Sequence, residues 1–147
     1  GRQGMKGLRS AMLVAVLATG FATGAAAQAP ATCGATLDAK ARLLAEVPGW
    51  QVVFVPKPAP VAVGRHFSLE LAVCPRDSAA RVTAVRVDAE MPAHRHGMNY
   101  AAKVSALGGD RYRADGLMFH MPGRWRFIFD IDSAGQTTRV THEVEVE

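Results

Sequence analysis

The 147-residue sequence lacks the short motifs that mark the common enzyme classes. It contains no GxSxG nucleophile motif, no phosphate-binding glycine loop, no paired-carboxylate motif and no free cysteine beside a histidine base. We therefore predict that the protein is not an enzyme and look for its function in binding.

The sequence also lacks an apolar run of the roughly 20 residues that a membrane-spanning helix requires. The strongest candidate, 11–27, is rich in Ala, Gly and Thr. It follows Lys6 and Arg9 and ends in the small residues 25–27, which is the pattern of a secretory signal peptide. We predict a cleaved signal peptide over 1–27 and a periplasmic or secreted protein. An uncleaved membrane anchor is the alternative.

Without residues 1–27, the sequence has no strong excess of positive or negative charge. The 17 basic residues fall to 14 with the loss of Arg2, Lys6 and Arg9, against 13 acidic residues, although the whole chain has a pI of about 9.5. No basic stripe or alternation of basic and aromatic residues remains. We therefore predict no nucleic-acid partner.

Cysteine is scarce, because the chain contains only Cys33 and Cys74. In a chain exported to an oxidising compartment an even pair of cysteines normally forms a disulfide, and we predict one here. The alternative is a pair of thiolate ligands for a soft metal, although the two residues lie far apart and have no CxxC spacing.

The hydrophobic pattern predicts an all-β protein. Residues 36–47 have roughly helical apolar spacing and end at Pro48 and Gly49, so we expect one short helix. After it come runs of β-branched residues separated by Gly, Pro and Asp. Seven strands are expected, over 51–55, 66–74, 81–90, 101–107, 112–119, 124–132 and 137–145.

Alternation within these runs indicates which side chains form the core. Trp125, Phe127, Phe129 and Ile131 fall on one face of their run. With no βαβ pattern, the chain is predicted to fold as a single antiparallel immunoglobulin-like β-sandwich of about seven strands. The predicted organisation is a signal peptide over 1–27, a lead with a short helix over 28–50, and the sandwich over 51–147.

Histidine and methionine are concentrated in one part of the sequence. Two short segments carry them, MPAHRHGM over 91–98 and HMP over 120–122, each at the end of an expected strand. If 93–99 is extended, His94, His96 and Met98 project to the same side. Imidazole with thioether favours copper, as Cu(I) or Cu(II), over zinc. The candidate metal ligands are Met91, His94, His96, Met98, His120 and Met121.

Several of these residues have a structural alternative. Met91 could face the core or the rim, and His120 and Met121 point to opposite sides if extended, so one of them alone would be a ligand. Met118 is expected in the core. His66 and His142 stand alone and are expected to be surface or strand residues.

The two His/Met segments, with their flanking residues from 85 to 100 and from 112 to 127, resemble the YtkA-like/FixH-like family of exported immunoglobulin-like domains. The resemblance covers roughly 64–146. It implies a β-sandwich and a setting near copper handling or oxidase assembly, with the first motif falling on Met91, His94, His96 and Met98 and the second on His120 and Met121.

Three functional hypotheses follow from the sequence. The first is a periplasmic copper carrier or buffer that exchanges its ion with a periplasmic or membrane partner. The second is an assembly module without metal, in which both segments are corners that dock on a partner protein. The third is a mononuclear copper redox enzyme, which lacks the free cysteine of a blue-copper site.

Overall fold

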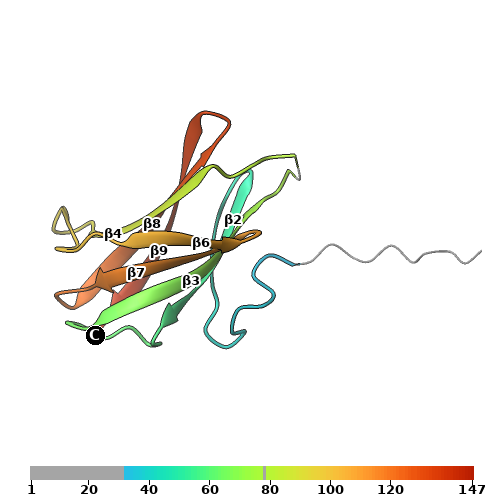
Figure 1. The fold of residues 1–147 in the computed structure, drawn as a ribbon. Coiled ribbons are helices and arrows are strands. Elements are labelled where there is room, and N and C mark those ends of the chain that lie inside the picture. The colour runs from blue at the N-terminus through green and yellow to red at the C-terminus, as the bar shows by residue number, and fades with distance from the viewer. Residues whose placement is uncertain (1–31, 78) are drawn as a thin grey trace, which may run out of the picture. The chain divides into compact units, whose positions relative to one another are not determined.

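The computed structural model describes residues 32–77 and 79–147, which belong to one compact unit. These residues form nine strands (Figure 1), and none of them lies in a helix that could span a membrane. The predicted signal peptide lies outside the described residues. The strands are β1 (Leu43–Val47), β2 (Trp50–Lys57), β3 (His66–Pro75), β4 (Ala84–Met91), β5 (His96–Gly97), β6 (Lys103–Gly108), β7 (Arg111–Met118), β8 (Gly123–Ser133) and β9 (Gln136–Val146).

The strands form two antiparallel sheets. One has five strands in the order β1-β2-β3-β7-β6, and the other has four in the order β5-β4-β8-β9. Their inner faces share one large hydrophobic core, so the predicted antiparallel sandwich is confirmed. The structure has more strands than the seven expected, because β1 and β5 were not among them.

The predicted helix over residues 36–47 is wrong. No helix occurs among the described residues of this segment, and strand β1 occupies its second half. Pro48 and Gly49 form a hairpin that returns the chain, so Val47 pairs with Trp50 and Ala45 with Val52. A short segment gains little from isolated helix formation, and pairing with β2 buries Ala45 in the core, which decides the outcome.

The core is aromatic at its centre. The alternation predicted for β8 is confirmed, since Trp125, Phe127, Phe129 and Ile131 are fully buried. Phe54 from β2 in the opposite sheet packs against Phe127 and Phe129, with ring centroids 5.3 and 4.9 Å apart. Such packing of large apolar side chains from two facing sheets is the main source of stability for a sandwich.

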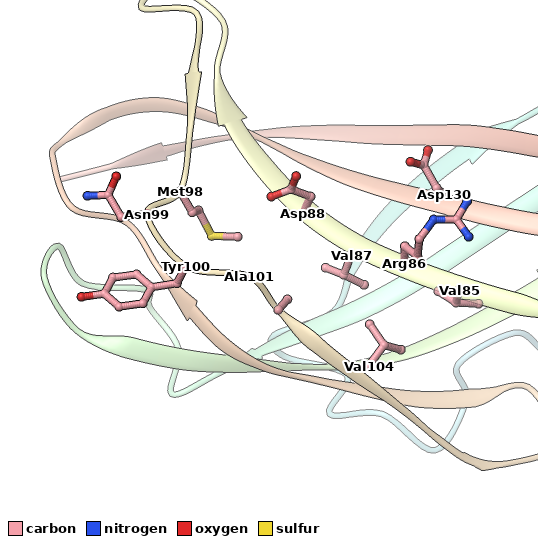
Figure 2. Close-up of a pocket in the computed structure, with 11 residues that line it drawn as sticks. Val85, Arg86, Val87, Asp88, Met98, Asn99, Tyr100, Ala101, Val104 and Asp130 are labelled. Carbon is pink, nitrogen blue, oxygen red and sulfur yellow. The ribbon is translucent and has the colours of Figure 1, made fainter.

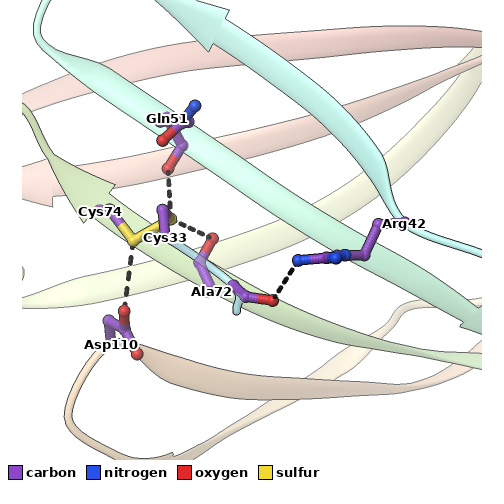
Figure 3. Close-up of a disulfide and its surroundings, with 7 residues drawn as sticks. Cys33, Arg42, Gln51, Ala72, Cys74 and Asp110 are labelled. Atoms are coloured by element: carbon purple, nitrogen blue, oxygen red, sulfur yellow. Dashed lines mark hydrogen bonds between the residues drawn. A yellow bond between two sulfur atoms is a disulfide. The ribbon is translucent and has the colours of Figure 1, made fainter. Parts of the chain in front are cut away.

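The lead before β1 covers the outer face of the five-stranded sheet. Leu37 is buried there against Val53, Val55 and Ala72, whose side chains point away from the main core. The predicted disulfide is confirmed, because Cys33 of the lead is bonded to Cys74 at the end of β3 (Figure 3). This bond fastens the lead to the sheet.

Candidate metal centre

The first His/Met segment folds back on the end of β4. After Met91 the chain makes a tight turn in which the N–H groups of His94 and Arg95 both donate to the carbonyl oxygen of Met91, at 3.1 and 2.9 Å. Arg95 has a left-handed φ of 54°. Strand β5 then pairs with β4, with His96 opposite Met91. The segment is therefore a turn followed by a short strand, and not extended throughout as the sequence analysis supposed.

The turn brings His94 and His96 together, with ring centroids 5.7 Å apart. His120 comes from a different part of the chain, the connection between β7 and β8 that passes from one sheet to the other. Its ring centroid lies 5.1 Å from that of His96. The three imidazoles thus form a row with His96 in the middle, which we call the histidine row.

A buried tryptophan supports the histidine row. The ring of Trp125 meets His96 and His120 edge to face, at centroid distances of 5.9 and 5.4 Å. Trp125 is itself stacked on Phe119 at 4.5 Å, and its indole N–H donates to the carbonyl oxygen of Met121 at 3.0 Å. A ring held on several sides gives the two imidazoles a rigid base. The sequence analysis assigned Trp125 to the core alone.

Hydrogen bonding leaves ring nitrogens of the histidine row available. His96 Nδ1 lies 3.2 Å from the carbonyl oxygen of Gly97, and in the tautomer that donates to this oxygen Nε2 presents a lone pair. His120 Nδ1 is buried and has no hydrogen-bond partner among the described residues. An unpartnered buried nitrogen is costly, and a bound metal ion would satisfy it.

The row is open rather than a closed cage. Among the described residues, one group of three or more His, Cys, Asp and Glu side chains has its ligand atoms within 4.8 Å of each other, and it is Cys33, Cys74 and Asp110. The histidine row does not meet that condition. His94 is exposed while His96 and His120 are half-buried, so closure around an ion requires rotation of side chains, which is easiest for His94.

The candidate methionines differ in their surroundings. Met91 is 2% exposed and belongs to the core, where its Cε lies 2.9 Å from the position that a Cβ on Gly123 would occupy. Met98 and Met121 are half-buried and pack against the rim of the core. Met118 is opposite His66 on the neighbouring strand and is half-buried, outside the core to which the sequence analysis assigned it.

Met98 also lines a groove of about 740 Å³. Figure 2 shows its thioether between Asp88 and Tyr100. A second hollow, of about 490 Å³, opens at His96 itself and is bordered by Glu90 and Arg126. A ligand could therefore reach His96 from solvent through this second hollow.

Two carboxylates near the segment are engaged elsewhere. Asp88 accepts the backbone N–H of Ala89 at 2.8 Å, and Glu90 forms an ion pair with Arg126 at 3.3 Å. Arg126 is also bonded to Glu143, which raises its pKa above the usual value. These carboxylates are paired without an imidazole, so the row gains its orientation from Trp125 and the turn.

The remaining histidines lie away from the row. His66 packs edge to face on Tyr100 with centroids 4.8 Å apart. His142 packs on Phe54 at 5.3 Å, and its Nδ1 lies 3.0 Å from the carbonyl oxygen of Leu44. Both have partners that account for their positions, which makes them suitable controls for the row.

Comparison with known proteins gives one match. Residues 45–130 match the model of the YtkA-like family, and this range includes β2, β3, β4, β7 and all three histidines of the row. No curated protein and no solved structure matches the chain.

Proposed function

Because this chain belongs to the YtkA-like family and gathers three imidazoles at one end of its β-sandwich, we propose that it is a periplasmic copper carrier or buffer. Copper is the cargo of this site, not a catalytic cofactor. The proposal includes no catalytic step, since the described residues around the row lack a nucleophile or a paired acid and base.

The observation that carries the proposal is the unpartnered Nδ1 of His120 next to His96. Buried polar atoms in native proteins nearly always have a partner, and an exception calls for a functional explanation. With the lone pair of His96 Nε2, the row offers two nitrogens from two segments far apart in sequence. His94 adds a third from the exposed side.

Copper fits this ligand set better than zinc. Imidazole alone suits both metals, and three histidines with an open position also make a zinc site. Met98 follows His96 by two residues and Met121 follows His120 directly, and both lie at the rim of the core. Thioether sulfur favours Cu(I), so a rim that offers nitrogen and sulfur together can hold either copper oxidation state.

An open row suits transfer better than permanent storage. An acceptor can replace the exposed His94 first, while the half-buried His96 and His120 retain the ion. The remaining ligands can then be exchanged one at a time, so the ion is never released to solvent. A closed site with four fixed ligands would hold copper more tightly and give it up more slowly.

The test is an anaerobic titration of the chain from Gln28 onward with Cu(I) against a coloured chelator, with Cu(II) and Zn²⁺ run in parallel. We expect tight copper binding that falls by at least about a hundredfold in His96→Ala and in His120→Ala, because loss of a ligand costs more than loss of its supporting group. His142→Ala is the matched control and should bind as the unchanged chain does. Equal binding by all four proteins, or tighter zinc than copper, would reject the proposal.

The groove beside Met98 favours a second function, docking on a partner protein without metal. Its apolar wall includes Val85, Val87 and Val104, and Tyr100 at its end is 45% exposed. On this view replacement of His94 and His96 by Asn leaves cellular activity intact, whereas Val104→Glu abolishes it. The copper proposal expects the reverse, with cellular activity lost in the asparagine variant and kept in Val104→Glu.

A further inference from the structure

A second cluster of potential ligands shares no residue with the histidine row. Cys33, Cys74 and Asp110 have their sulfur and carboxylate atoms within 4.8 Å of one another. In Figure 3 the Asp110 carboxylate points at the disulfide, and its Oδ2 lies 3.2 Å from Cys74 Sγ. We propose that reduction of the Cys33–Cys74 disulfide creates a metal site for a thiophilic d¹⁰ cation of the Zn²⁺ type, with Asp110 as the third ligand.

The backbone of Asp110 is held by the N–H of Val73, which donates to its carbonyl oxygen at 2.9 Å, but its carboxylate gains no hydrogen bond from the disulfide. A disulfide sulfur carries no hydrogen, so the carboxylate oxygen 3.2 Å away receives no hydrogen bond from it. Once the bond is reduced, the same oxygen can accept from the Cys74 thiol or share a cation with its thiolate. The carboxylate therefore gains a partner when the disulfide is reduced.

The distances suit a tetrahedral ion. With Zn–S near 2.3 Å and Zn–O near 2.1 Å, two ligand atoms of one zinc ion stand about 3.6 Å apart for sulfur and oxygen and about 3.8 Å for two sulfurs. The observed 3.2 Å between Cys74 and Asp110 is close to the first value. The two sulfurs must separate, which rotation of the cysteine side chains can supply. Water completes the fourth position.

The lead stays in place without the disulfide, so Cys33 remains near Cys74. Leu37 is 4% exposed and packs on Val53 and Val55. Arg42 donates to the carbonyl oxygen of Gly34 at 3.3 Å, and Arg111 donates to the hydroxyl of Thr36. These contacts lie within a few residues of Cys33 and do not depend on the bond.

A dithiol can serve as the reductant of the Cys33–Cys74 disulfide. The dithiol gives two electrons and two protons to the disulfide, becomes a cyclic disulfide itself, and leaves two thiols on the chain. Zn²⁺ then binds as both thiols lose their protons, so one ion taken up releases two protons. Both cysteines are half-buried, which leaves them open to attack by a small thiol.

Asp110 distinguishes this site from an ordinary pair of free thiols. Two thiolates alone suit Cu(I), whereas a carboxylate ligand is hard and favours Zn²⁺. The proposal therefore requires that zinc affinity depend on Asp110. It is independent of the histidine row, and either site can fail without the other.

The test measures Zn²⁺ binding to the chain from Gln28 onward in a His94→Ala/His96→Ala/His120→Ala background, which removes the row. The protein is reduced with dithiothreitol, desalted without oxygen, and titrated with Zn²⁺ against a coloured chelator. We expect one Zn²⁺ per reduced chain and none per oxidised chain. Asp110→Asn should weaken reduced binding by at least about tenfold, and the exposed Asp77→Asn should not change it.

Circular dichroism of each reduced protein accompanies the titration. The proposal is overturned if oxidised and reduced chains bind zinc alike, if Asp110→Asn binds as tightly as Asp77→Asn, or if the reduced chain unfolds and so cannot hold Cys33 in place. Asp110→Asn keeps both cysteines and is expected to fold with its disulfide formed, so the comparison with Asp77→Asn starts from folded proteins.

Discussion

The polar side chains on the solvent face of the four-stranded sheet differ in their pairing from those at the histidine end of the same sheet. On the face, arginines pair with acidic side chains across neighbouring strands. The pairs are Arg86 with Asp132, Arg139 with Asp130, Arg124 with Glu145 and Arg126 with Glu143. At the end, the buried Nδ1 of His120 has no hydrogen-bond partner in the part of the chain that the structure describes.

This difference locates binding within the fold. Exposed ion pairs contribute little stability each, but they leave no charge free for a ligand. In the histidine row, the unpartnered nitrogen of His120 lowers the stability of the fold, but nitrogen lone pairs stay available to bind an ion. We infer that the charged side chains on this face neutralise one another, and that the histidine end of the sheet is where an ion is exchanged. Three changes test this contrast, taken from the largest expected effect to the smallest.

The largest effect is expected at the base of the row. Trp125→Leu removes the stacking on Phe119 and the hydrogen bond to Met121, and we expect it to lower the free energy of unfolding by roughly 3 kcal/mol, near the lower end for truncation of a buried tryptophan. Copper affinity should fall as well, because His96 and His120 lose their support. Urea denaturation and the chelator titration measure the two quantities.

Trp50→Leu provides the control, since Trp50 is also buried but lies on β2, outside the contacts of the row. It should lower stability and leave the copper affinity of the folded protein unchanged. If both substitutions weaken copper binding equally, Trp125 stabilises the domain in general and does not position the imidazoles.

The second effect is expected when His120 is replaced, which should raise the stability of the metal-free domain and weaken copper binding. His120→Leu removes the unpartnered Nδ1, so the metal-free domain should gain about 1 kcal/mol in its free energy of unfolding. The same change removes a proposed ligand, so we expect added copper to raise the thermal midpoint of the unchanged chain and not that of the variant. Thermal and urea denaturation with and without copper measure both.

A loss of stability in metal-free His120→Leu would contradict the contrast, because the imidazole would then be contributing to the fold. Leu is chosen because it keeps most of the packing against Trp125. A change to Ala would add a cavity and obscure the sign.

Much of the sandwich could be predicted from the sequence, because its strands alternate. Trp125, Phe127 and Phe129 are two residues apart, and burial of one face of β8 follows directly. Strand β1 could not be predicted in this way. Its apolar residues fit a helix as well as a strand, and the pairing of Ala45 with Val52 depends on a partner that no local pattern reveals.

The candidate site was only partly accessible from the sequence. Clustering of histidine and methionine pointed to the two segments, but the neighbourhood of His96 and His120 depends on how the sheets pack. The extended backbone supposed for 93–99 missed the turn at Arg95, because a left-handed residue other than glycine leaves little trace in a sequence. The contact between Asp110 and Cys74 likewise comes from the hairpin before β7.

The smallest effect is expected on the charged face. Arg86 and Thr137 donate to Asp132 and lower the pKa of its carboxyl to about 2, from an ordinary value of 3.8. A carboxyl with a lowered pKa stabilises the folded state above its unfolded pKa, and this contribution is lost as the pH falls from about 4 through about 2. Asp132→Asn removes the contribution, so the unchanged chain and the variant should differ most above pH 4 and converge near pH 2. Urea midpoints measured across this range give the difference, which should be small because the pair is exposed.

Copper affinity near neutral pH should be the same in both proteins. A variant that lost copper binding would show that the face and the histidine end are coupled, and the contrast between them would have to be abandoned.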